Sequence, residues 1–97
     1  EGFDSPRDRQ ILFMPYFVYM LRTVSSKKNK TYVGYTNNIQ NRLKKHNSNK
    51  GAKSTKGYKW NIIYNKKFIK KSNAMKFEYK LKKDRKERMK IINNNLM

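Results

Sequence analysis

The 97-residue chain contains no cysteine, few acidic residues and no long apolar run. Without cysteine it can form neither disulfides nor thiolate metal sites. No apolar run approaches the roughly 20 residues that a membrane-spanning helix needs. The start of the chain shows no signal-peptide pattern, and we expect an intracellular protein of the cytoplasm or nucleus.

The shortage of acids leaves a strongly basic chain. Lysine and arginine together number 25 against 6 aspartates and glutamates, which gives a formal net charge of +19 at pH 7. Such a charge opposes compaction, so we expect a polyanionic partner, with nucleic acid first and an anionic membrane surface second. A disordered basic tail would be poor in aromatic residues, whereas they make up 13% of this chain. We therefore expect one small folded domain.

The first 13 residues differ in character from the rest of the chain. They hold three of the six acids, and the first lysine is Lys27. We interpret residues 1–13 as an N-terminal extension or an expression remnant that is poorly ordered. Residues 14–97 then form the single domain, with Met14 as a candidate native start.

Hydrophobic patterning predicts three strands and two helices. The expected strands span residues 16–22, 31–35 and 60–68, and the expected helices residues 37–47 and a long final segment from Ser72 or Asn73 to about 92. The first strand reads as covered on both faces, and the short connection makes the second strand antiparallel to it. The order β-β-α-β-α predicts an α+β fold, a small three-stranded antiparallel sheet flanked by helices.

Helical periodicity turns two cations of residues 37–47 toward the apolar side. At about 100° per residue, Arg42 and His46 flank the seam made by Ile39 and Leu43, while the lysines of this segment face water. Arg42 could extend over the edge of the core, with His46 as a satisfied boundary residue. The other interpretation is that both side chains belong to a functional site.

Glu78 is the only acid between Arg9 and Lys83. Periodicity places it on the apolar stripe of the final helix, where a lone carboxylate is costly unless a cation meets it. It either pairs with Arg42 or a lysine, or it binds a hard divalent cation. Magnesium suits a single carboxylate completed by waters and substrate phosphate oxygens.

Two tyrosines and a glycine lie within the first two expected strands. Tyr19 and Tyr32 are mid-strand, where tyrosine ordinarily packs with its hydroxyl at the rim. Gly34 inside a strand pattern marks a bulge or a close approach by another backbone or a ligand. A basic loop follows the first expected helix, and it is either a solvated loop or a surface for phosphates; its lysines are Lys50, Lys53, Lys56 and Lys59.

Together these residues resemble the GIY-YIG nuclease superfamily. The half-motifs of that family are matched by "FVY" at 17–19 and "YVG" at 32–34, and Arg42, His46 and Glu78 follow in the expected order. The resemblance covers about residues 16–92 and is nearest to the small single-domain branch, which is related to the catalytic domain of structure-specific flap and junction endonucleases. Phe17 departs from the family pattern, because it replaces the first glycine of the name motif.

The resemblance implies a divalent-metal-dependent DNA endonuclease that acts on structured or nicked DNA with little sequence specificity. Glu78 would hold one Mg²⁺ or Mn²⁺, and Arg42 would donate to the scissile phosphate. Tyr19 or Tyr32 would take the proton of the attacking water, with the phenolate favoured by nearby cations and the metal. His46 would orient the tyrosine or the water, or act as an alternative base. The loop lysines would grip the DNA backbone, and an assisting protein partner would supply target choice.

Other functions stay open at this point. A non-catalytic basic nucleic-acid-binding module could retain the same fold, and composition alone also permits a ribosome-type RNA-binding protein. A membrane-surface peptide is least favoured, because neither helix shows a wide lipid-facing apolar side.

Overall fold

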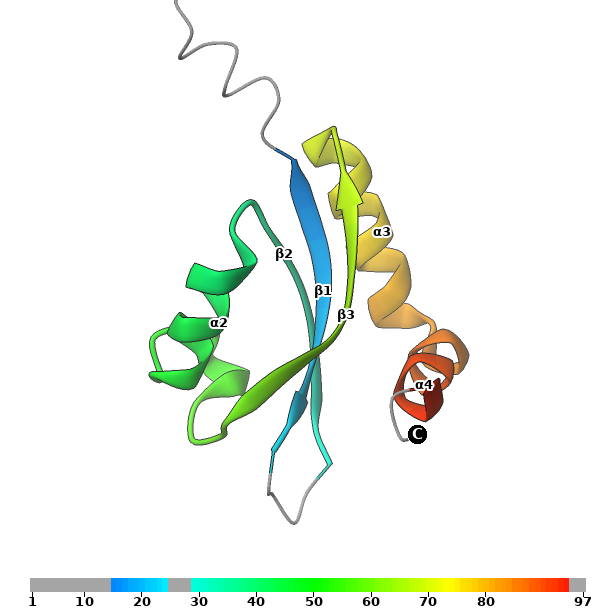
Figure 1. Ribbon diagram of the computed structural model, residues 1–97. Helices are drawn as coiled ribbons and strands as arrows, with labels where there is room; N and C mark the ends of the chain where they lie inside the picture. The colour runs from blue at the N-terminus through cyan, green and yellow to red at the C-terminus, as the bar shows by residue number, and fades with distance from the viewer. Residues whose placement is uncertain (1–14, 25–28, 95–97) are drawn as a thin grey trace, which may run out of the picture.

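The computed structural model describes residues 15–24 and 29–94 (Figure 1). The elements in chain order are β1 (Tyr16–Thr23), β2 (Thr31–Thr36), α2 (Ile39–Asn47), the short 3₁₀ helix η1 (Lys53–Thr55), β3 (Trp60–Phe68), α3 (Lys71–Lys83) and α4 (Arg85–Asn94). The predicted N-terminal extension, residues 1–13, lies outside the described residues. Within the described part of the chain, every helix is too short or too polar to cross a membrane.

The three strands form one antiparallel sheet in the order β2-β1-β3. Helix α2 covers one face, and α3 with α4 covers the other (Figure 1). The central strand β1 is therefore enclosed on both sides, and four successive residues, Val18 to Leu21, are each at most 2% exposed. This confirms the α+β fold predicted from the order of the elements.

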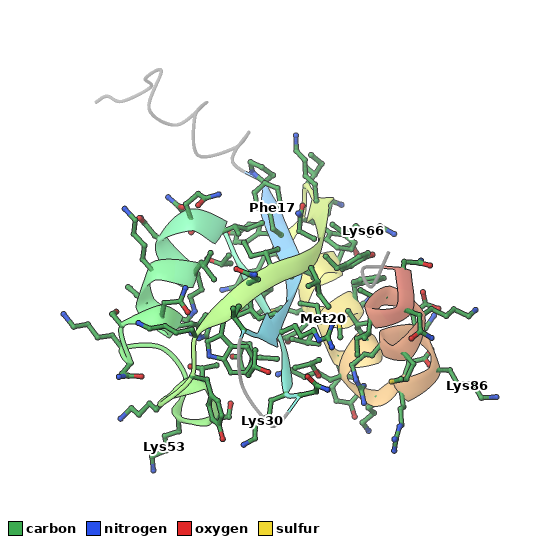
Figure 2. The ribbon with its side chains drawn as sticks, turned by 60° about the horizontal axis from the view of Figure 1, so that its bottom comes forward. Phe17, Met20, Lys30, Lys53, Lys66 and Lys86 are labelled. Carbon is green, nitrogen blue, oxygen red and sulfur yellow. The ribbon has the colours of Figure 1, made fainter. Side chains whose placement is uncertain are left out.

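Alternation along β1 divides the core into two clusters. Val18 and Met20 pack with Val33, Ala74, Leu81 and Ile91 on the side of α3 and α4. Figure 2 shows Met20 at the centre of the molecule, while Lys53 and Lys86 extend outward. Tyr19 and Leu21 face the other way, where Trp60 completes the buried group and Tyr32 and Leu43 flank it. Each apolar face thus buries its own set of side chains.

Helix α2 begins with an asparagine cap and carries its most buried side chain in its last turn. Asn38 has extended backbone angles, and its side-chain oxygen accepts the Asn41 backbone N–H at 3.1 Å. Ile39 and Leu43 form the predicted seam and are half-buried. His46 is 0% exposed, so the residue buried most completely in this helix is polar.

Two asparagines at the end of α2 tie down the basic loop that follows. Asn47 accepts the backbone N–H of Trp60 at 2.6 Å and donates to the Trp60 carbonyl at 3.3 Å. Asn49 has a φ of 65° and accepts the Gly57 N–H at 2.8 Å. The loop between α2 and β3 is therefore closed by hydrogen bonds at its base.

The prediction of one long final helix is wrong, because Asp84 separates α3 from α4. Asp84 has φ −100° and ψ 88°, and its carboxylate accepts the Glu87 backbone N–H at 3.0 Å as a cap of α4. The Arg88 guanidinium donates to the carbonyls of Leu81, at 2.8 Å, and Lys82, which satisfies the end of α3. The break brings Ile91 back to the core, where it is 7% exposed.

The predicted start of the final helix also differs from the structure. Helix α3 begins at Lys71, and Lys70 occupies the cap position without a side-chain cap. The expected caps Ser72 and Asn73 lie inside the first turn. Periodicity predicted helical structure over this segment, but it did not give the local backbone at either end.

Replacing Asn47 with alanine is expected to destabilise the domain by about 1–3 kcal/mol, because two part-buried backbone groups of Trp60 lose their partner. Urea unfolding followed by tryptophan fluorescence measures the change. Asn41→Ala is the matched control, since Asn41 is an exposed asparagine on the same helix. Equal unfolding midpoints for the two variants would contradict the role given to Asn47.

Candidate active site

Three aromatic rings from three different elements meet on the face of the sheet that α2 covers. Tyr19 comes from β1, Tyr32 from β2 and His46 from α2. The His46 ring centroid lies 4.9 Å from that of Tyr32 and 6.0 Å from that of Tyr19, and the two tyrosine rings are 6.3 Å apart. The antiparallel register causes this meeting, since it sets Leu21 opposite Tyr32 and Tyr19 opposite Gly34.

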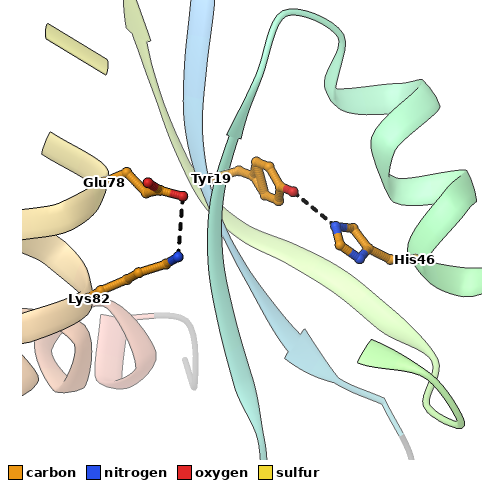
Figure 3. Close-up of polar contacts among 4 residues, drawn as sticks. All are labelled: Tyr19, His46, Glu78 and Lys82. Carbon is orange, nitrogen blue, oxygen red and sulfur yellow. Dashed lines mark hydrogen bonds and ion pairs between the residues drawn. The ribbon is translucent and has the colours of Figure 1, made fainter. Parts of the chain in front are cut away.

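A chain of buried hydrogen bonds runs from the sheet through α2 to the basic loop. The Tyr19 hydroxyl lies 2.9 Å from His46 Nε2 (Figure 3). His46 Nδ1 lies 2.9 Å from Thr55 Oγ1, and the Thr55 hydroxyl donates to the Ala52 carbonyl at 2.7 Å. Tyr19 is 2% exposed, and His46 and Thr55 are 0% exposed. Both nitrogens of the buried imidazole are therefore satisfied.

Burial is the main influence on the protonation of Tyr19 and His46. It raises the pKa of Tyr19 to about 12, although the hydrogen-bonding guanidinium of Arg42 acts in the opposite direction. Burial, with the Arg42 charge, lowers the pKa of His46 below 6.5. Desolvation therefore outweighs the Arg42 cation at Tyr19, and the expectation that cations together with a metal favour a phenolate stays a prediction. At neutral pH both members are uncharged.

Arg42 lies one helical turn before His46 and acts on both tyrosines. Its hydrogen-bonding interaction with Tyr19 is the largest cause that raises the pKa of Arg42, and Tyr32 contributes in the same direction. The guanidinium is half-buried and fully charged. It therefore places a positive charge beside two phenol oxygens, where an anion could also be bound.

Glu78 lies on the other side of the sheet from this cluster. It forms an ion pair with Lys82 one turn along α3, with 3.4 Å between Nζ and Oε2, and its side chain is 18% exposed (Figure 3). The Lys82 ammonium also lies 6.0 Å from the Tyr32 ring centroid. Of the five predicted catalytic residues, four meet near α2, and Glu78 lies across the sheet from Tyr19 and His46, with Lys82 beside both Glu78 and Tyr32.

Glu78 offers carboxylate oxygens as ligands for a metal ion. Among the described residues, no group of three or more histidine, cysteine, aspartate or glutamate side chains could hold an ion. A single partly exposed carboxylate does not suit zinc, which needs three or four protein ligands. It does suit magnesium or manganese, which bind through one or two carboxylates, with waters and substrate phosphate oxygens as the other ligands. The residues present fit such an ion, provided that Lys82 leaves the carboxylate.

Two glycines make room for the cluster. A Cβ at Gly34 would lie 2.7 Å from the Tyr19 hydroxyl oxygen and 2.9 Å from Tyr32 Cε2. A Cβ at Gly51 would lie 2.4 Å from His46 Nδ1. Gly34 keeps a regular register with β1, and the close approach there is made by the tyrosine side chains. Both positions require the absence of a side chain.

Sequence reasoning did not find Thr55, Ala52 or Gly51. They lie in a loop whose lysines dominated its interpretation, and a hydroxyl residue in a polar loop gives no periodic pattern. The available signal was weak, a glycine followed by Ser54 and Thr55 among the lysines. Only the folded loop brings the threonine hydroxyl to the imidazole.

The loop that carries Thr55 also carries the predicted DNA-binding lysines. All four are exposed: Lys50, Lys53, Lys56 and Lys59. The chain has no acidic residue between Asp8 and Glu78, so α2 and its loop are uniformly basic. A surface of one sign favours contact with a polyanion, and the contact with DNA stays a prediction.

A family model and several relatives match most of the chain. The model described as the GIY-YIG catalytic domain matches residues 15–92. A UPF0213 protein of Oceanobacillus iheyensis is 44% identical over 79 residues, which cover 79% of this chain and 88% of that protein. A UPF0213 protein of Staphylococcus haemolyticus is 39% identical over 79 residues, covering 79% of this chain and 93% of that protein. A solution NMR structure of a UPF0213 protein from Bacillus halodurans is 33% identical, covers 82% of this chain and 84% of that chain, and gives a TM-score of 0.46.

Stability should fall as the pH drops below about 6.5, the ordinary pKa of histidine in an unfolded chain. His46 is the single histidine, and its pKa is lowered by burial in the folded protein. Between the two pKa values the unfolded chain binds more protons, so the free energy of unfolding rises with pH across this window. NMR titration of His46, with urea unfolding at several pH values, measures both quantities. A titration midpoint at or above 6.5 would show that the imidazole is not buried as described.

Proposed function

Because the chain belongs to the GIY-YIG catalytic domain family, a nuclease family, we propose that it is a divalent-metal-dependent DNA endonuclease. Its reaction would be hydrolysis of phosphodiester bonds in structured or nicked DNA, with little sequence specificity. The observation that supports this best is the meeting of Tyr19, Tyr32, Arg42 and His46 beside a uniformly basic loop. A purely structural cluster would not need a charged guanidinium turned toward two phenols.

Arg42 would bind the scissile phosphate. Hydrogen bonding to the Tyr19 phenol oxygen favours the charged form of Arg42, and a guanidinium has further N–H groups that can donate to an anion. Charge-assisted hydrogen bonds of this kind strengthen as negative charge grows on the phosphoryl oxygens in the transition state. The role fits the position of Arg42, half-buried at the edge of the cluster.

The Tyr19–His46 pair would receive the proton of the attacking water. A phenol with a pKa of about 12 is a poor base by itself, so Tyr19 needs an acceptor for its own proton. His46 Nε2 lies at hydrogen-bond distance, whereas Tyr32 meets His46 through its ring. In the proposed step the Tyr19 oxygen takes a proton from water while the Tyr19 proton passes to His46 Nε2. The oxygen of that water forms a bond to phosphorus, the bond to the 3′ oxygen breaks, and the 3′ oxygen takes a proton from solvent.

Glu78 is the residue that would hold one Mg²⁺ or Mn²⁺. When bound, such an ion would neutralise a non-bridging oxygen and help the 3′ oxygen to leave. Glu78 would contribute the oxygen ligands, and the bound ion would replace Lys82 as the partner of the carboxylate. Lys82 would then be available to the DNA phosphates.

The exposed loop lysines would bind the sugar-phosphate backbone. Such contacts give affinity without sequence readout, and they make binding weaken steeply as salt rises. An assisting protein partner would supply the choice of target.

A second candidate function is a non-catalytic DNA-binding module. The observation in its favour is the position of Glu78, which is paired with Lys82 on the far side of the sheet from Tyr19 and His46. This candidate predicts DNA binding that does not depend on metal and leads to no strand break.

Replacing Glu78 with glutamine should reduce metal-dependent cleavage by more than roughly 100-fold while DNA binding persists, since a direct ligand is lost. The assay compares nicked, flapped, branched and plain duplex DNA, with Mg²⁺, with Mn²⁺ and with a chelator. Glu87→Gln is the matched control, because Glu87 is an exposed carboxylate on α4. Cleavage by Glu78→Gln at the wild-type rate would end the metal role, and binding by the wild type without any cleavage would favour the module.

Replacing Arg42 with lysine should lower the turnover number by about 100-fold, because a point charge does not reproduce the paired donors of a guanidinium. Lys44 is the neighbour for comparison, and Lys44→Ala should change only the salt dependence of DNA binding. Single-turnover cleavage at saturating enzyme separates the two effects. If Arg42→Lys alters binding affinity alone, Arg42 is an ordinary phosphate contact.

A further inference from the structure

We infer that Thr55 is a positioning residue that holds His46 in the tautomer with hydrogen on Nδ1, so that Nε2 accepts the proton of Tyr19. The part concerning cleavage rests on the proposed function. The part concerning the tautomer rests only on hydrogen bonding within the protein.

The donor and acceptor of each hydrogen bond follow from the last acceptor in the series, the Ala52 carbonyl. The Ala52 carbonyl oxygen cannot donate, yet it lies 2.7 Å from Thr55 Oγ1. Two oxygens at this separation need a hydrogen between them, so the Thr55 hydroxyl hydrogen points to Ala52. Thr55 Oγ1 is then left with lone pairs only, and it must accept from His46 Nδ1 at 2.9 Å.

With hydrogen on Nδ1, a neutral imidazole presents a lone pair at Nε2. Because that atom lies 2.9 Å from the Tyr19 oxygen, the phenol has to donate to it. Tyr19 therefore donates to His46, His46 donates to Thr55, and Thr55 donates to the Ala52 carbonyl. Each of the three contacts then has one donor and one acceptor, and for a neutral imidazole no other arrangement satisfies all three.

This order suits proton transfer from Tyr19. When Nε2 gains the proton, Nδ1–H still donates to Thr55, so none of the other bonds has to reverse. In the opposite tautomer, Nε2 would already carry hydrogen and could not take the Tyr19 proton. Thr55 therefore keeps His46 able to act, as a fixed second partner does for many catalytic or metal-binding histidines.

Packing holds the imidazole and the threonine in place. The loop backbone at Gly51 lies so close to the His46 ring that a Cβ there would clash with Nδ1. The carbonyl of Thr55 accepts the Trp60 indole N–H at 3.0 Å. The Thr55 backbone N–H also donates to Ala52, at 3.0 Å, which fixes the single turn of η1. The loop that presents the lysines outward thus presents Thr55 inward.

The test compares Thr55→Val with Thr55→Ser. Valine keeps the shape of threonine but has no oxygen, whereas serine keeps the hydroxyl. Nitrogen NMR of His46, the single histidine, reports the tautomer without assignment ambiguity. We expect hydrogen on Nδ1 in the wild type and in Thr55→Ser, and a shift toward hydrogen on Nε2 in Thr55→Val.

Cleavage kinetics provide the second readout. Thr55→Val should lower kcat by roughly 10–100-fold, as loss of an outer partner does, with the KM for DNA unchanged. Thr55→Ser should restore most of the kcat, which a loss of packing alone would not predict.

The NMR result tests the tautomer of His46, and the kinetic result tests its role in cleavage. Hydrogen on Nε2 in the wild type would overturn the inference, and so would a Thr55→Val variant with unaltered tautomer and kcat. If the wild type cleaves no DNA, the proposed function fails, while the tautomer comparison still decides the role of Thr55. If Thr55→Val does not fold, Thr55→Cys offers a similar size with a weak acceptor, and the same shift is expected.

Discussion

The hydrogen bond between the Tyr19 hydroxyl and His46 is the contact on which the arrangement of the α2 face depends. It joins the central strand to α2 at a point where both side chains are almost completely buried. A buried imidazole is tolerated only when both nitrogens are bonded, so His46 also requires Thr55 from the following loop. That requirement fixes the turn at Ala52, excludes a side chain at Gly51 and brings the loop lysines close to the cluster.

The sheet separates two kinds of chemistry. On the α2 side lie the neutral tyrosine–histidine chain, the charged Arg42 and a loop without acids. On the α3 side lie the acids of the described residues, among them Glu78 with its partner Lys82. A DNA strand that used both sides would have to lie along the β2 edge, where Tyr32 faces Lys82. The family is that of a nuclease domain, and the proposed reaction uses residues from both sides of the sheet.

Local sequence patterns predicted some elements of this fold accurately and missed others. The strand at 60–68 was predicted to the residue, and α2 to within two residues, because apolar alternation and helical spacing are properties of adjacent positions. The break at Asp84 was missed, because one capping carboxylate in a lysine-rich stretch changes the periodicity very little. Thr55 was missed because its partner is nine residues away along the chain and is brought to it only by the loop.

The sequence by itself determined the order of the three strands and the first helix, the α+β class and the basic charge, since these are set by local periodicity and composition. The family followed separately, from the resemblance of its spaced motifs to those of known nucleases. The tertiary structure alone decided which residues share a surface. It brought Tyr19, Tyr32, Arg42 and His46 together, added Thr55 and two close-packed glycines, and placed Glu78 across the sheet with Lys82. The reason is physical: a hydrogen bond or an ion pair depends on distances of a few ångströms between atoms, and strand register and loop closure set those distances.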